Sequence, residues 1–281
     1  MAHVRKPEWL KIDLRADNHF AQVSSVLKCY SLHTICTSGR CPNMAECWSR
    51  GTATFMILGD VCTRSCKFCN TATGRPLPPD PDEPQRLAES VKQIALKHAV
   101  ITSVARDDLP DYGAAHWAKC IEAIFSVNPA TTVEALIPDF RGDRTLIDKV
   151  IEVKPAVISH NIETVRRLTP AVRSAAKYDV SLETLAHIAR SGIPAKSGLM
   201  LGLGETEAEI FQTMDDLRTA GCTILTIGQY LQPSRKHLPV EAYIHPDTFA
   251  EYKTIALNKG FKKVESAPLV RSSYRAEQHI I

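Results

Sequence analysis

The stretch "TFMILGDVCTRSCKFCN" (residues 54–70) joins a predicted strand to a loop that carries three cysteines. Its first seven residues form a short, β-rich apolar run, as expected for a strand of a parallel sheet. Cys62, Cys66 and Cys69 follow in a C-x3-C-x2-C pattern. Parallel α/β folds place their chemistry in the loops at the carboxyl ends of strands. The stretch therefore predicts a metal-binding loop on an α/β fold.

The rest of the chain repeats the alternation of strand and helix. Five further β-rich runs span 99–105, 131–138, 156–161, 195–203 and 222–231, and helical periods span 83–98, 114–126, 181–192 and 206–221. Thr206 with Glu209 has the spacing of a capping box, and Gly221 is a plausible helix stop. Six strand–helix units imply a parallel sheet with right-handed crossovers, either an open doubly wound sheet or an incomplete barrel. The proline-rich segment 74–84 is expected to be an extended spacer.

Composition narrows the class of protein. The 281 residues carry a net charge of +3, which is too mild to indicate nucleic-acid binding. No apolar run approaches the roughly 20 residues of a membrane span, and the N-terminus lacks the apolar core of a secretory signal. We expect a cytoplasmic protein with no membrane association. In a reducing compartment its nine cysteines are expected to be metal ligands or core residues rather than disulfides.

A second cysteine triplet precedes the first. Cys36, Cys41 and Cys47 are spaced C-x4-C-x5-C. Thiolates suit zinc, copper(I) or iron–sulfur clusters, and structural zinc sites usually combine two C-x2-C pairs, or one pair with two histidines. Neither pattern is present. Three thiolates can hold three irons of a [4Fe–4S] cluster and leave the fourth iron without a cysteine; a structural zinc loop is the alternative.

The C-x3-C-x2-C pattern, with the aromatic Phe68 before its last cysteine, resembles the radical S-adenosylmethionine (SAM) superfamily. The resemblance implies that SAM binds the open iron through its amino and carboxylate groups. It also implies that an electron from the cluster cleaves SAM to a 5′-deoxyadenosyl radical, which abstracts hydrogen from unactivated carbon. Phe68 is expected to lie at the cofactor.

The second triplet, together with "LVRSSYRAE" near the C-terminus, resembles the lipoyl synthase family of that superfamily. The resemblance implies an auxiliary [4Fe–4S] cluster on Cys36, Cys41, Cys47 and Ser273. Family position favours Ser273, because the pattern alone does not distinguish it from Ser272. The implied reaction is the insertion of two sulfur atoms, supplied by the auxiliary cluster, at C6 and C8 of a protein-bound octanoyl-lysine group. Ser273 would be a releasable ligand, since a hard alkoxide binds such iron less firmly than a thiolate.

The resemblance also implies a fold and its division. We expect an α/β protein with a partial (β/α)6 TIM-type barrel, an N-terminal cysteine-rich extension and a C-terminal segment closing over the barrel mouth. The expected parts are residues 1–50 with the auxiliary cysteines, 51–235 forming the barrel, and 236–281 with a helix and the RSSY segment. All three are expected to form one integrated domain.

Polar residues at two strand ends are candidates for SAM contacts. Asn161 and Glu163, in "SHNIET", are placed to hydrogen-bond a ribose diol, as in a similar stretch of biotin synthase. The alternative is that Asn161 caps a helix beginning at Ile162. Arg106 and Asp107, in "ARDDLPDYGA", are placed to hold the methionyl part, and the alternative is a surface ion pair.

The implied partners are proteins. The substrates would be octanoylated lipoyl carrier domains, namely the E2 subunits of 2-oxoacid dehydrogenases and the H protein of glycine cleavage. An electron donor such as flavodoxin or ferredoxin and an iron–sulfur cluster carrier are also implied. Two rivals remain: a radical enzyme whose second cluster only relays electrons, and a non-catalytic iron–sulfur or zinc protein.

Overall fold

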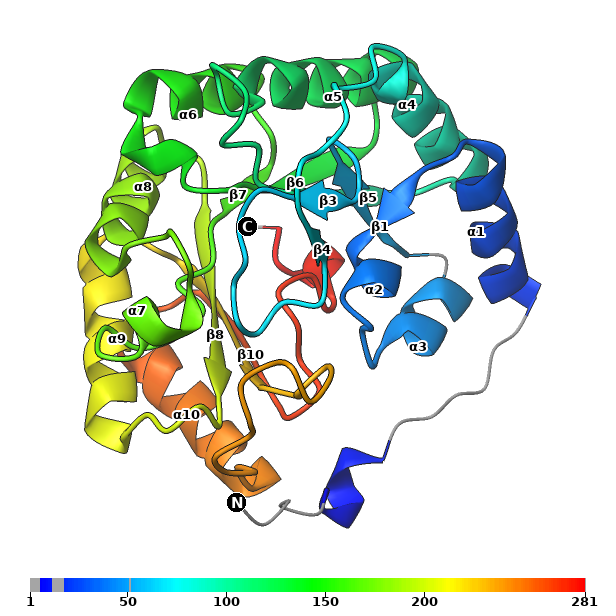
Figure 1. Ribbon diagram of the computed structural model, residues 1–281. Coiled ribbons are helices and arrows are strands. Elements are labelled where there is room, and N and C mark those ends of the chain that lie inside the picture. The colour runs from blue at the N-terminus through cyan, green and yellow to red at the C-terminus, as the bar shows by residue number, and fades with distance from the viewer. Residues whose placement is uncertain (1–5, 12–17, 51, 281) are drawn as a thin grey trace.

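One eight-stranded sheet forms the centre of the computed structural model, which describes residues 6–11, 18–50 and 52–280 (Figure 1). The strands follow the order β1-β2-β5-β6-β7-β8-β9-β10, and only the β1–β2 pair is antiparallel. Their bounds are β1 His33–Thr34, β2 Thr54–Ile57, β5 His98–Ser103, β6 Thr132–Leu136, β7 Val157–Ser159, β8 Ala195–Leu201, β9 Ile224–Gln229 and β10 Lys263–Ser266. Sequential neighbours around the sheet are typical of a barrel, whereas a doubly wound sheet reverses its order. The partial barrel is confirmed.

The longer helices surround the sheet (Figure 1). The helices are α1 Asn18–Cys29, α2 Ile35–Ser38, α3 Met44–Ser49, α4 Glu83–Ile94, α5 Ala114–Val127, α6 Arg144–Glu152, α7 Thr169–Val172, α8 Tyr178–Arg190, α9 Glu207–Thr219 and α10 Pro246–Asn258. Short 3-10 turns span Glu8–Leu10, Phe140–Gly142 and Ala276–Gln278, and β3 Val61–Cys62 pairs with β4 Ala72–Thr73 in the cysteine loop. None of the helices in the described residues is long and apolar enough to cross a membrane.

Alternation along the strands separates an apolar outer face from a polar interior. Phe55, Ile101, Val133 and Leu225 belong to the core under the helices. Their neighbours along the strands project to the opposite face, because successive side chains of a strand alternate. Those inward positions include Thr54, His98, Glu134 and Lys196, and all four of these side chains are buried. The interior of the barrel is therefore a polar environment.

All six predicted strands are present, and the structure adds β1 and β10 to the same sheet. β1 is a two-residue antiparallel edge strand, and β10 pairs with β9 at the other edge. The predicted start and end of the helix over 206–221 are also observed. Thr206 and Glu209 form the predicted capping box at α9, and Gly221 follows that helix with a φ of +86°. Residues 75–80 are irregular as expected, and α4 begins at Glu83 with proline in its first turn.

Candidate active site

The two cysteine triplets lie at different ends of the barrel. Cys62, Cys66 and Cys69 follow β2 at its carboxyl end. Cys36, Cys41 and Cys47 line a cavity together with Thr54 and His98, which are the first residues of β2 and β5. The structure therefore brings each triplet together by itself and places the barrel interior between them.

Backbone amides and hydroxyl groups lie around Cys62, Cys66 and Cys69, which we call the loop triplet; Cys36, Cys41 and Cys47 are the auxiliary triplet. Cys62 Sγ accepts hydrogen bonds from the backbone N–H groups of Arg64 at 3.4 Å and Ala105 at 3.3 Å. Cys69 Sγ lies 3.3 Å from Thr71 Oγ1. Burial raises the pKa of Cys62 and of Cys69, and the neighbouring thiols of the triplet raise both pKa values further. Three soft donors facing one another fit a [4Fe–4S] cluster, since a bound cation reverses this preference for the neutral thiol.

The auxiliary triplet meets the C-terminal segment, as predicted. Ser273 and Arg271 line the same cavity as the three thiols. Thr54 Oγ1 donates a hydrogen bond of 2.7 Å to Ser273 Oγ. Three thiols and one hydroxyl in one cavity fit a cluster with a serine as its fourth ligand. His98 also lines this cavity, and its buried Nε2 has no hydrogen-bond partner.

Burial and neighbouring thiols both raise the pKa values of Cys41 and Cys47. Burial raises the pKa of Cys41 to about 11, and the neighbouring Cys36 adds to the increase. Burial raises the pKa of Cys47 to about 12, with further contributions from Cys41, Cys36 and Glu46. Burial lowers the pKa of Arg271, while the adjacent Cys41 opposes that shift. Without a metal the thiols favour their neutral form, so cluster assembly must release protons.

Contacts with both the cysteine-rich extension and the barrel hold the C-terminal segment. Asn43 Nδ2 donates to Leu269 O at 2.7 Å, and Tyr274 OH donates to Glu46 Oε1 at 3.0 Å. Further along, His279 Nδ1 lies 3.0 Å from Lys196 Nζ in the interior. Figure 1 shows this red segment inside the ring of strands. Thr54 and Lys196 lie at the amino ends of β2 and β8, so the segment closes the amino-terminal mouth of the barrel, in agreement with the sequence prediction.

Asn161 and Glu163 lie beyond β7, but not on a helix. Glu163 forms a parallel bridge with Leu199 of β8 and has a φ of +67°, and the next helix, α7, begins only at Thr169. The alternative in which Asn161 caps a helix at Ile162 is therefore wrong. The buried Oδ1 of Asn161 has no hydrogen-bond partner. Burial raises the pKa of Glu163, which Arg173 and Asn161 counteract.

Arg106 and Asp107 are already engaged by other side chains. The Arg106 guanidinium forms two hydrogen bonds of 2.9 Å with the carboxylate of Asp108. Asp107 accepts from Arg64 Nε at 2.9 Å and from Arg141 Nη2 at 3.0 Å. Burial raises the pKa of Asp107, but the two arginines more than offset this and leave it lowered. A role of either residue at the cofactor stays a prediction.

Phe68 lies half-buried against a small apolar cluster behind the loop. Its neighbours there are Val172, Leu203 and Tyr230, from α7 and from the ends of β8 and β9. The ring therefore anchors the cysteine loop to the barrel rim. A direct contact of Phe68 with SAM stays a prediction as well.

Some site residues were missed from the sequence. Arg173 is buried near Glu163, and its Nη1 donates to Ser181 Oγ at 2.8 Å. Lys196 and Glu134 form a fully buried pair, with Nζ 2.8 Å from Oε1. Lys196 sits in the predicted run 195–203 and Glu134 in 131–138, so an ionisable residue inside each strand was the available signal.

Comparisons with known proteins agree with this geometry. The Radical SAM superfamily matches residues 56–217. "Lipoyl synthase" of Parabacteroides distasonis is 63% identical over 278 residues, covering 99% of both chains. "Lipoyl synthase" of Treponema denticola is 58% identical over 277 residues, covering 99% of this chain and 96% of the relative.

Solved structures with little sequence similarity share the fold. Methylornithine synthase (PylB) has a TM-score of 0.57 at 12% identity, with 86% of this chain and 81% of that chain covered. HydG, a maturase of the [FeFe]-hydrogenase, has a TM-score of 0.58 at 13% identity, with 81% and 58% covered. The relatives at 58–63% identity and the family model place the chain in the lipoyl synthase family of the radical SAM superfamily.

Proposed function

We propose that this chain inserts two sulfur atoms at C6 and C8 of a protein-bound octanoyl-lysine group. The observation that carries the proposal is the pair of three-cysteine sites, one of which shares its cavity with a candidate fourth ligand, Ser273. An electron relay is better served by four cysteines, and a zinc scaffold does not need two sites at opposite ends of a barrel. Two sites with different fourth positions suit one centre for radical generation and one for sulfur supply.

Each group of residues has a distinct task in this proposal. Cys62, Cys66 and Cys69 hold the cluster that binds SAM, and Cys36, Cys41 and Cys47 with Ser273 hold the auxiliary cluster. When bound, the first cluster would supply the electron that cleaves SAM, and the auxiliary cluster would supply the sulfide that enters the product. Asn161 and Glu163 are assigned to the ribose of SAM, because the unpartnered Asn161 Oδ1 faces the interior beside Gly198.

Ser273 is the residue we assign to sulfur release. The hydrogen bond from Thr54 stabilises the charged form of the Ser273 oxygen, the form that binds iron. The Fe–O bond remains the weakest of the four protein bonds, since iron in a sulfide cluster prefers soft donors. Release of Ser273 would then free one iron without breaking a thiolate bond.

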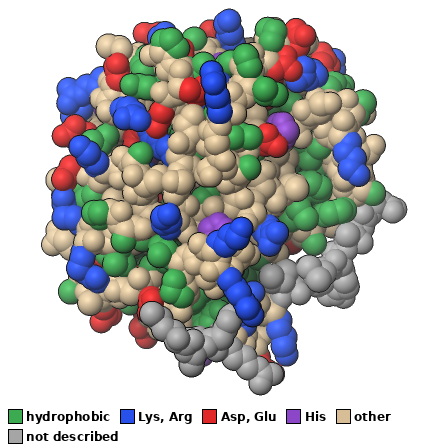
Figure 2. Space-filling view, viewed as in Figure 1, with side chains coloured by type: hydrophobic (Ala, Val, Ile, Leu, Met, Phe, Trp, Pro, Cys, Tyr) green, Lys and Arg blue, Asp and Glu red, His purple; other side chains and the backbone are tan. Residues whose placement is uncertain are grey.

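Partners follow from the acyl group and from the surface around the cysteine loop. Residues 232–240 form a loop that contacts the cysteine loop, since Leu238 N–H donates to Lys67 O at 3.2 Å. Lys67, Arg235 and Lys236 are exposed on these two loops. Positive side chains are prominent near the centre of the face shown in Figure 2. Acidic octanoylated carrier domains, of E2 subunits or the glycine cleavage H protein, fit this rim.

The remaining partners and the compartment follow from the cofactors. We assign an electron donor such as flavodoxin or ferredoxin, because cleavage of SAM needs an electron. We also assign an iron–sulfur cluster carrier, because the auxiliary cluster is consumed in the proposed reaction. All nine cysteines are free thiols. A reducing cytoplasm suits such a protein.

Anaerobic reconstitution followed by a single reaction tests the proposal. We expect about eight irons per chain for two [4Fe–4S] clusters. With SAM, a reductant and an octanoyl-lysine peptide, we expect 5′-deoxyadenosine and a dithiolated peptide. An octanoylated carrier domain should react faster than the peptide at low salt, and this advantage should shrink at high salt. Nucleoside without sulfur insertion would support the electron-relay rival, and the absence of nucleoside would contradict radical chemistry.

A further inference from the structure

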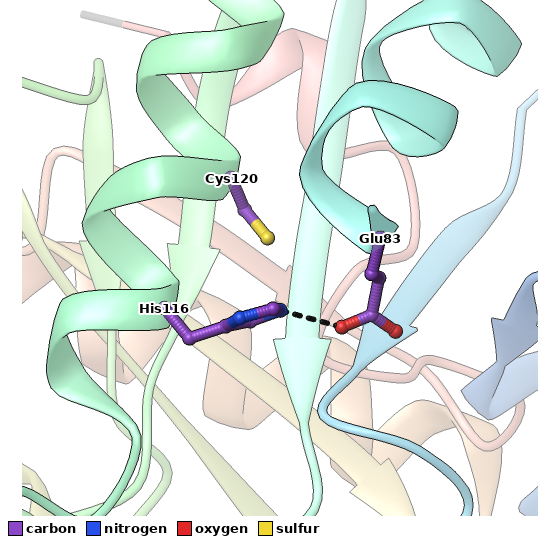
Figure 3. Close-up of side chains that lie close together, drawn as sticks. All are labelled: Glu83, His116 and Cys120. Carbon is purple, nitrogen blue, oxygen red and sulfur yellow. Dashed lines mark hydrogen bonds and ion pairs between the residues drawn. The ribbon is translucent and has the colours of Figure 1, made fainter. Parts of the chain in front are cut away.

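A buried group of polar side chains lies outside the two cysteine sites, between the starts of α4 and α5. Glu83 is the first residue of α4, and His116 and Cys120 lie one turn apart on α5. Figure 3 shows the three side chains pointing into the space between these helices. Their ligand atoms all lie within 4.8 Å of one another. The group therefore has either a metal-binding role or a structural role connected with the site.

The hydrogen bonds of Glu83 indicate that this group holds the backbone of Leu58. Glu83 Oε2 lies 2.6 Å from His116 Nε2 and also accepts the backbone N–H of Leu58 at 2.9 Å. Oε2 of Glu83 is thus used twice, once toward His116 and once toward the Leu58 backbone. Cys120 is fully buried, and burial raises its pKa well above the ordinary value, with a further contribution from Glu83. The recorded hydrogen bonds thus join Glu83 to His116 and to the Leu58 backbone, and Cys120 takes no part in them.

Leu58 occupies an unusual backbone position. It follows the last residue of β2, and both Leu58 and Gly59 lie in the left-handed region, with φ of +68° and +91°. A leucine rarely adopts this conformation, so the surrounding structure must hold it there. The chain turns here from β2 into the loop that carries the first cluster cysteine, Cys62, four residues later.

Two side chains, those of Glu83 and Arg106, and the close approach of Gly113 hold this one residue. Glu83 accepts the N–H of Leu58, and Arg106 Nη1 donates to the C=O of Leu58 at 3.3 Å. Arg106 is itself fixed by the bidentate pair with Asp108. The buried Leu58 side chain fits over Gly113, where an added Cβ would lie 2.5 Å from Leu58 Cδ1. Gly113 is the N-cap of α5, the helix that carries His116.

We propose that Glu83, His116 and Arg106 form a clamp on Leu58 that positions Cys62 and thereby the SAM-binding cluster. The clamp and the cluster loop share a second connection, because Ala105 N–H donates to Cys62 Sγ and Ala105 directly precedes Arg106. Arg106 is then a positioning residue and does not touch the cofactor. The proposal rests on the proposed radical function for its consequence, but the clamp itself is a property of the fold.

The test compares Glu83→Ala and His116→Ala with wild type and with Cys120→Ala as the matched control. Cys120 belongs to the same group but has no recorded hydrogen bond to Leu58 or to Glu83. Backbone amide exchange over residues 57–62 should become faster in the two clamp variants and stay unchanged in the control. In reconstituted protein with full iron content, the Kd for SAM should rise about 10-fold, as is typical when an outer-shell partner is lost.

Conservative replacement and metal content separate the outcomes. Glu83→Gln keeps an acceptor for Leu58 N–H and a hydrogen bond to His116, so it should retain wild-type SAM affinity. A lowered Tm with unchanged exchange and SAM affinity in Glu83→Ala would overturn the proposal. Zinc or another metal present in wild type and lost in Cys120→Ala would also overturn it and show a metal site. If wild type cleaves no SAM, the proposed function fails, while amide exchange still decides whether the clamp exists.

Discussion

Ser273 differs from the other cluster residues in the hardness of its ligand atom. It shares a cavity with three cysteines and accepts a hydrogen bond from Thr54. A cysteine at the same position would supply a fourth soft donor and a stronger bond to iron. As a ligand, Ser273 would therefore be the weak protein bond at the centre from which we propose that sulfur leaves.

Replacing Ser273 with cysteine should separate cluster binding from sulfur transfer. We expect the variant to keep its iron and to form 5′-deoxyadenosine, because the loop triplet is untouched. The dithiolated product should fall at least about 10-fold, the typical scale for a change at a metal's ligand shell. Iron analysis, nucleoside chromatography and mass spectrometry of the peptide measure the three quantities. Full turnover of Ser273→Cys would refute the releasable-ligand hypothesis, and Ser272→Cys is the matched control.

The two cysteine triplets could be recognised from the sequence, but the residues that surround them in the fold could not. Cysteine spacing is a local property of the chain, and it identified both triplets. Glu83 acts on Leu58, which is 25 positions away, and Arg173 lies close to Glu163 only after folding. Nothing in a linear pattern marks such pairs. The cofactor contact predicted for Arg106 from its position at a strand end stays a prediction, and its contacts with Asp108 and Leu58 were not predicted.

Secondary-structure elements were predictable in proportion to their length and regularity. The six central strands have apolar runs that periodicity detects, and the α9 capping box has a sequence signature. β1 has only two residues, too few for any period, and it exists because it pairs with β2. β10 has a burial pattern with one buried residue in four, so its sequence carries little strand signal.

Strand β9 positions the RSSY segment through a close approach at Gly228. A Cβ at this position would collide with the carbonyl oxygen of Val270 and approach Arg271 Nη1 to 3.4 Å. Gly228→Ala should therefore displace Ser273 from the auxiliary cavity. We expect the iron content to fall from about eight toward about four, with SAM cleavage retained at the intact loop triplet. Iron analysis and nucleoside yield measure both effects.

Gly192→Ala provides the control for the Gly228 variant. Gly192 has a φ of +85°, and an added Cβ would meet no atom within 4 Å, so this change strains the backbone without touching the RSSY segment. It should lower the stability of the protein but leave the iron content unchanged. Equal iron contents in wild type and Gly228→Ala would contradict the docking role of β9.

At the scale of the whole molecule, the fold separates two metal centres along one barrel. We infer that residues 1–50, 51–235 and 236–281 act as one unit, because β1 and β10 extend the central sheet on either side. Further contacts join the first and last parts directly: Arg50 Nη2 lies 3.0 Å from Glu277 Oε1.

The most direct test of this division follows the sulfur. The protein would be reconstituted with sulfide labelled with a heavy sulfur isotope and given one equivalent of octanoyl-lysine peptide without free sulfide, and the product mass would be measured. We predict that both inserted sulfurs carry the label in wild type, and that a variant with Cys36, Cys41 and Cys47 replaced by alanine forms 5′-deoxyadenosine but no thiolated peptide. Unlabelled sulfur in the product, or thiolated peptide from that variant, would contradict the assignment of the Ser273 site as the sulfur source.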